Sequence, residues 1–81
     1  MSNDLDNKIL KIVSKKLRVE LEKVTPEKSL IDDLGADSLD VIEVIMALEY
    51  DFGILIVDEE VEKTKTVKQI LELTKQKIEH T

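Results

Sequence analysis

The stretch that decides the fold runs from Leu34 to Phe52 and reads LGADSLDVIEVIMALEYDF. Within it, apolar residues recur three, four, seven and eleven positions apart, which is the spacing of one complete buried helix face. The residues of this face are Val41, Val44, Ile45, Leu48 and Phe52. Gly53 follows directly, and glycine commonly terminates helices. We therefore expect a helix over residues 38–52, packed into a core along one side.

The same predicted helix carries a second apolar stripe, which a small bundle does not need. At about 100° per residue this stripe falls on a different side of the helix. Its residues are Leu39, Ile42 and Met46. The polar residues around it are Asp40, Glu43, Glu49 and Tyr50. Either the loop over residues 18–37 packs over this stripe, or the stripe is a docking surface on which methionine suits several partners.

Two more segments show the spacing of amphipathic helices. An uninterrupted pattern predicts a first helix over about residues 3–17. Its repeating positions are Leu5, Ile9, Ile12, Val13, Lys16 and Leu17. A capping box formed by Thr66 and Gln69 predicts the start of the last helix. The inner stripe of that helix is Val67, Ile70, Leu71, Thr74 and Ile78.

The connecting segments lack a sustained period. Over residues 18–37, Thr25-Pro26 is a helix-start signal that only a short turn can follow. We expect the apolar residues of this loop to anchor it to the core: Val19, Leu21, Val24, Leu30, Ile31 and Leu34. Residues 54–57 have strand propensity but no partner strand, so we expect an extended linker. Asp58 can then cap a short helix over about residues 59–63 that buries Val61.

These elements predict an all-α fold. The expected architecture is a small four-helix bundle, with three main helices, one short helix and a long loop between the first two. Eighty-one residues provide only one core, so residues 1–81 are expected to form a single domain.

Charge is distributed unevenly along the chain. The net charge is −6, and residues 36–63 contain nine acids and one base. This arrangement argues against nucleic acid and anionic membranes as partners and favours proteins with basic patches. A merely solvated acidic surface is the alternative interpretation.

Composition excludes several other classes of protein. The sequence contains no cysteine, which rules out disulfides, zinc–thiolate sites and protein-borne thiol chemistry. Its apolar runs are too short to span a bilayer, and its acidic start is unlike a signal peptide. The acids lack the spacing of a calcium-binding EF-hand loop, so no metal site is predicted. We expect a cytoplasmic monomer without stable membrane insertion.

Ser38 admits more than one role. Asp37 or Ser38 can cap the helix over residues 38–52. Catalysis by this serine is disfavoured because it needs a nearby base, and the single histidine, His80, lies next to the C-terminus. A helix N-terminus also favours an anion, such as a phosphate attached to Ser38.

A longer segment, DDLGADSLDVIEVIMALEYDFGILIVDEE, resembles the acyl carrier proteins of type II fatty acid synthesis. The resemblance extends from the first amphipathic helix to the Thr66 cap. It implies that Ser38, flanked by Asp37, receives 4′-phosphopantetheine from coenzyme A through a phosphopantetheinyl transferase. The thiol of that arm would carry growing acyl chains as thioesters, and the chain itself would not be an enzyme.

The resemblance also implies a partner surface for fatty acid synthesis enzymes with basic patches. Its expected acids are Asp40, Glu43, Glu49, Asp58 and Glu59, and its expected apolar contacts are Leu39, Ile42 and Met46. In the family the acyl chain can also slip between the helices.

The chain departs from many family members at four positions. Leu30 stands in place of Phe, Tyr50 and Leu55 in place of acids, and Val57 in place of Pro. Two other functions stay open. One is a carrier in a different assembly line (polyketide, nonribosomal peptide or D-alanyl transfer), and the other is an unmodified acidic adaptor in which Ser38 only caps the helix.

Overall fold

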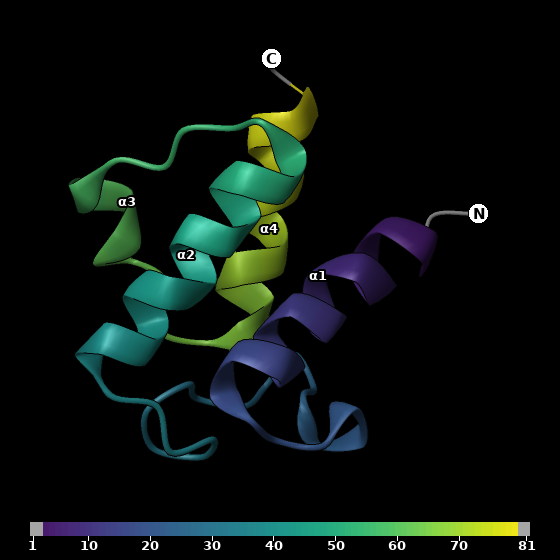
Figure 1. The fold of residues 1–81 in the computed structure, drawn as a ribbon, viewed down its shortest axis with the longest axis vertical. Coiled ribbons are helices and arrows are strands. Elements are labelled where there is room, and N and C mark those ends of the chain that lie inside the picture. The colour runs from purple at the N-terminus through teal and green to yellow at the C-terminus, as the bar shows by residue number, and fades with distance from the viewer. Residues whose placement is uncertain (1–2, 80–81) are drawn as a thin grey trace.

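The computed structural model describes residues 3–79, which form an all-α bundle (Figure 1). Its elements in chain order are α1 (Asn3–Leu17), the 3-10 helix η1 (Leu21–Lys23), α2 (Ser38–Phe52), α3 (Asp58–Val61) and α4 (Val67–Glu79). The predicted fold class and the three main helices are confirmed. The short helix η1 was not predicted, because its three residues carry no periodic pattern.

α2 ends and α4 begins where the sequence signals lie. Gly53 ends α2 in the left-handed conformation at φ 64°, with its N–H donating to the Glu49 carbonyl. Thr66 and Gln69 form the predicted capping box of α4. The Gln69 N–H donates to Thr66 Oγ1 at 3.3 Å, and the Thr66 N–H donates to Gln69 Oε1 at 3.0 Å. Two orphan amides at the start of α4 are thereby satisfied.

The prediction for the short helix was partly wrong. This helix, α3, begins at Asp58, so Asp58 is its first residue and not its cap. The N-cap is Val57, whose N–H donates to Glu60 Oε1 at 3.1 Å. The Glu60 carboxylate thus reaches back over one turn and satisfies the amide of the cap residue. Val61 is only partly buried against the core.

Residues 54–57 form neither helix nor strand, as expected of a linker. Ile54 and Ile56 are buried, whereas Leu55 and Val57 are exposed. This alternation pins the segment to the core by every second side chain.

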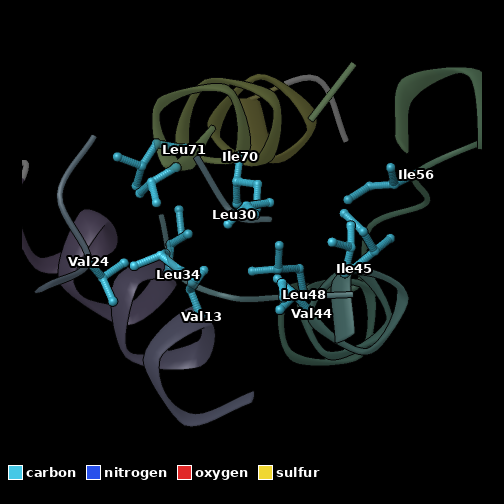
Figure 2. Packing of buried hydrophobic residues seen from close by; sticks show 14 of the residues in the cluster. Val13, Val24, Leu30, Leu34, Val44, Ile45, Leu48, Ile56, Ile70 and Leu71 are labelled. Atoms are coloured by element: carbon cyan, nitrogen blue, oxygen red, sulfur yellow. The ribbon is translucent and has the colours of Figure 1, made fainter. Parts of the chain in front are cut away.

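The core lies between α1, α2 and α4, and loop residues fill its ends (Figure 2). Figure 2 shows Val13 of α1 facing Val44 and Leu48 of α2, with Ile70 of α4 on the opposite side. These four side chains are fully buried. The core is aliphatic, and Phe52 lies partly buried at its margin.

The loop over residues 18–37 is fastened to the start of α4. The Leu30 N–H donates to the Lys65 carbonyl, and the Val67 N–H donates to the Lys28 carbonyl, each at 3.0 Å. Lys68 adds a third bond, from its N–H to the Pro26 carbonyl at 2.9 Å. Ser29 and Thr66 therefore form an isolated antiparallel bridge that no local sequence signal predicted.

The anchors of this loop were only partly predicted. Val24, Leu30 and Leu34 are buried as expected, but Leu21 and Ile31 are 43% and 58% exposed. Without a period, the sequence did not show which apolar loop residues face inward. The predicted turn after Thr25-Pro26 is present, since the Lys28 N–H donates to the Thr25 carbonyl at 3.0 Å.

Candidate functional site

Ser38 is the first residue of α2, and Asp37 is the cap. The Asp40 N–H donates to Asp37 Oδ1 at 2.9 Å, and the Asp37 N–H donates to Asp40 Oδ2 at 3.2 Å. The two aspartates thus satisfy both ends of a capping box. Of the two caps that the sequence allowed, the structure selects Asp37, and this leaves the serine without a capping role.

The Ser38 side chain is exposed, and its hydroxyl makes no hydrogen bond to any residue in the range 3–79. The other serines in that range behave differently. Ser14 Oγ donates to the Val19 carbonyl at 2.6 Å, and Ser29 Oγ accepts from the Asp32 N–H at 3.1 Å. Ser38 is therefore the described serine whose hydroxyl is free to react.

The chain before Ser38 holds it in a fixed place. Gly35 turns the backbone at φ 74°, a conformation that residues with a Cβ rarely adopt. Ala36 then buries its methyl group and donates its N–H to the Leu30 carbonyl at 2.9 Å. The start of α2 is thereby tied to the same loop that α4 holds.

The helix start suits a phosphate group. Asp40 and Val41 have acceptors for their N–H groups on Asp37, at 2.9 and 3.1 Å. The amides of Ser38 and Leu39, at the first two positions of α2, have no acceptor within the helix. Those two N–H groups and the dipole of a 15-residue helix favour an anion on the serine, opposed by the charges of the two capping aspartates.

An apolar groove opens beside Ser38. Its volume is about 240 Å³, and its walls include Leu30, Ile31, Val41 and Val61. At Ile42 it adjoins a second groove of about 410 Å³ between α2 and α3. The sequence did not identify Ile31 or Val61 as lining residues of this groove. For Ile31 the one available signal was that it is an apolar residue in a loop without a periodic pattern.

The second apolar stripe of α2 is uncovered. Leu39, Ile42 and Met46 are 69%, 46% and 59% exposed, so the loop over residues 18–37 does not pack over them. Ile42 and Met46 line the groove between α2 and α3 together with Glu49 and Asp58. The structure therefore brings these four predicted site residues into one place.

The remaining predicted acids differ in their surroundings. Glu43 and Glu59 are exposed and line neither of these two grooves. Asp40 is engaged in the capping box, and Glu49 Oε2 accepts from the Ile56 N–H at 2.8 Å. Both of these carboxylates therefore have a structural task that the sequence did not reveal.

Two other kinds of site are absent from the described part of the chain. Between residues 3 and 79, no three histidine, aspartate or glutamate side chains come together in a way that could hold a metal ion. None of the helices described there is long and apolar enough to cross a membrane. His80, the single histidine, lies outside the described residues.

Several known proteins are similar to this chain over most of its length. Residues 7–74 match the family model described as a phosphopantetheine attachment site. The chain is 49% identical over 76 residues to an acyl carrier protein from Thermosynechococcus vestitus, with 94% of each chain covered. It also resembles the solved structure of an acyl carrier protein from Enterococcus faecalis. That match has a TM-score of 0.76 and 35% identity, and it covers 93% of this chain and 95% of the other.

The Thermosynechococcus and Enterococcus matches both span nearly the whole chain, and the family model covers most of it. The chain therefore belongs to the acyl carrier protein family, whose members are carriers with a covalently attached 4′-phosphopantetheine group and are not enzymes.

Proposed function

We propose that Ser38 is the attachment residue and that the protein carries growing fatty acyl chains for type II fatty acid synthesis. The observation that best supports this proposal is the free, exposed hydroxyl of Ser38 at the first residue of α2, beside a groove of about 240 Å³. In the proposed modification, the serine oxygen bonds to phosphorus while the pyrophosphate bond of coenzyme A breaks, so that adenosine 3′,5′-bisphosphate leaves and the hydroxyl proton is released. When bound, the group supplies a terminal thiol that forms thioesters.

The groove beside Ser38 supports an acyl cargo. Its walls are mostly aliphatic, and it adjoins the larger groove between α2 and α3. Burying a chain of methylene groups there removes apolar surface from water, worth roughly 0.8 kcal/mol for each CH₂ fully buried. The proposed role of the groove is to shelter part of the acyl chain between deliveries.

Charge supports enzymes with basic patches as the partners. Nine acids lie within residues 36–63, and the exposed apolar stripe of α2 lies among them. Acids of this kind steer a basic partner to the surface, and the apolar side chains then form the contact. A carrier of polyketide, nonribosomal peptide or D-alanyl assembly would use the same serine. The kind of group loaded on the thiol therefore distinguishes these carriers from a carrier of fatty acyl chains.

Intact mass spectrometry tests the attachment. After incubation with coenzyme A, Mg²⁺ and a broad-specificity phosphopantetheinyl transferase, we expect a gain of one phosphopantetheine. Ser38→Ala should stay folded and gain nothing, whereas Ser14→Ala and Ser29→Ala should still be modified. If the native protein gained no mass, the attachment proposal would be wrong, and Ser38 would be a surface residue of an unmodified adaptor.

The pathway is tested on the modified protein. Purified enzymes of type II fatty acid synthesis should load and extend acyl groups on it. Loading with an amino acid alone would instead assign the protein to another assembly line.

The partner surface is tested by charge reversal. Glu43→Lys should slow association with a fatty acid synthesis enzyme, and the difference should shrink as salt rises. Glu72→Lys, an exposed acid on α4, is the matched control and should have a smaller effect. Unchanged association of Glu43→Lys with every enzyme tested would show that this acid is not part of the docking surface.

A further inference from the structure

A groove runs between α1 and α2, away from the grooves beside Ser38 and α3. Its volume is about 430 Å³, and its walls include Ile12, Ala47 and Tyr50. A second depression of about 400 Å³ adjoins it at Ile12 and reaches Phe52. We call the two together the α1–α2 groove. It is distinct from the groove beside Ser38, with which it shares no lining residue, and it meets the groove between α2 and α3 only at Met46.

The two walls of the α1–α2 groove carry opposite charges. Four exposed lysines form the α1 wall: Lys8, Lys11, Lys15 and Lys16. Glu43 and Asp51 form the α2 wall. None of these six side chains belongs to an ion pair found within residues 3–79, where the paired lysines are Lys23, Lys75 and Lys77. The charged side chains of both walls therefore face solvent without an ion-pair partner in that range, and the apolar floor of Ile12, Ala47 and Tyr50 lies between them.

Two exposed side chains of types that are common in protein interfaces, Met46 and Tyr50, line this groove. Tyr50 is 88% exposed and Met46 is 59% exposed. Tyrosine and methionine are enriched where proteins meet, and tyrosine is frequent among residues whose loss weakens binding. Tyr50 follows Met46 by one helical turn, so it extends the exposed stripe of α2 toward α1.

We propose that the α1–α2 groove is a second docking surface, whose occupant is an amphipathic helix of a partner protein. Its apolar face lies on Ile12, Ala47 and Tyr50. Its acidic edge faces the lysines of α1, and its basic edge faces Glu43 and Asp51. The lysines of α1 thus recognise acids of the partner, and Glu43 and Asp51 recognise its bases. Because the two walls have opposite charges, they fix the orientation of the partner helix in the groove.

Other occupants fit the charges less well. An anionic membrane would meet the lysines of α1 but would be repelled by the net charge of −6 and by the acids of α2. A second copy has lysines of its own for the Glu43–Asp51 wall, but it also carries the same net charge of −6, which opposes the association of two copies. A helix with two oppositely charged edges complements both walls at once.

The test uses a designed helical peptide of about 15 residues, long enough to be partly helical. Its apolar stripe is flanked by glutamates on one edge and lysines on the other. Added to the isotope-labelled full chain, with and without phosphopantetheine, it should shift the amide NMR signals of Ile12, Lys15 and Tyr50. A peptide with serines in place of its apolar stripe should not.

Protein variants make the test specific. Lys15→Gln/Lys16→Gln should weaken peptide binding about three- to tenfold, since each exposed ion pair contributes little. The matched control Lys23→Gln/Lys68→Gln changes net charge equally and should leave binding within about twofold. Tyr50→Ser should also weaken peptide binding. If the peptide contacted only the acids of α2, the Lys15→Gln/Lys16→Gln variant would bind it as tightly as the native protein or more tightly.

Several results would overturn the proposal: peptide shifts confined to α3 or absent, equal effects of the two lysine pairs, concentration-dependent dimers, or binding to phosphatidylglycerol vesicles that depends on Lys15. The proposal does not rest on the carrier function, because the peptide is tested on the unmodified chain too. Failure of either proposal leaves the other intact.

Discussion

Asp37 and Asp40 cap each other across the start of α2, each accepting the backbone N–H of the other at 3.2 Å or less. Ser38 lies between them with a free hydroxyl. The reciprocal pair thus performs the stabilising task that serine has at many helix starts. A residue that held the helix together could not also be modified without cost, and under the attachment proposed above the two roles belong to different residues.

The first prediction concerns this cap. Asp37→Ala should lower the free energy of unfolding by about 1 kcal/mol, because the Asp40 amide loses its acceptor. Urea denaturation measures the change. Asp51→Ala removes an acid from the other end of the same helix and should not destabilise, since a negative charge there opposes the helix dipole. Equal losses for both variants would contradict the capping argument.

The second prediction concerns a buried hydroxyl. Thr74 is fully buried, and its Oγ1 has no hydrogen-bond partner among the residues from 3 to 79. Thr74→Val should therefore raise the free energy of unfolding by about 1 kcal/mol. Thr64 is the control, because it is buried but its hydroxyl donates to the Val61 carbonyl at 2.6 Å. Thr64→Val should lower stability in the same thermal or urea measurement.

The third prediction concerns the end of α1. Arg18 adopts φ 60°, a conformation that costs a residue with a Cβ about 1 kcal/mol and costs glycine little. Arg18→Gly should raise the free energy of unfolding by about 0.5 kcal/mol, measured by urea denaturation. Lys11→Gly places the same residue inside α1 and should instead lower it by about 1 kcal/mol. A loss at position 18 would mean that the arginine side chain outweighs its backbone strain.

The fourth prediction concerns pH. Lys77 Nζ lies 2.8 Å from Glu60 Oε1, and this hydrogen bond, followed by the one from the Val57 N–H, lowers the pKa of Glu60 below its ordinary value of 4.5. A depressed native pKa stabilises the fold above the ordinary value, and that contribution is lost as pH falls through the native value. Lys77→Met should raise the pKa of Glu60, followed by carboxyl NMR titration.

The same variant should also show a smaller loss of stability between pH 6 and pH 3, as expected when one depressed carboxyl is returned toward normal. Lys68→Met removes an exposed lysine from the same helix and is the control. A Glu60 titration curve identical in Lys77→Met and the native protein would refute the assignment.

The helices could be predicted because their information is local. A period of 3.6 residues, the Gly53 stop and the Thr66–Gln69 box each depend on residues within a few positions. The fold class and the presence of a second apolar stripe on α2 followed from the same pattern, whereas the exposure of that stripe did not. The choice between Asp37 and Ser38 as cap did not, because both side chains can accept the same kind of amide.

What the sequence could not provide depends on distant pairs. Leu21 and Ile31 were expected to anchor the loop, yet both are exposed, since only tertiary packing decides which aperiodic residues turn inward. The Glu49 carboxylate holds the Ile56 amide seven residues away, a contact with no periodic signature. The bridge between Ser29 and Thr66 joins segments 37 positions apart in the same way.

That bridge has a consequence for the order of events in the cell. Residues 28–30, which precede Ser38, bond to residues 65–67, which follow it in the chain. A nascent chain that has completed α2 but not the start of α4 lacks these bonds, so this contact must await residues 65–67. If the proposed attachment at Ser38 requires the native geometry around it, the modification follows the synthesis of that segment.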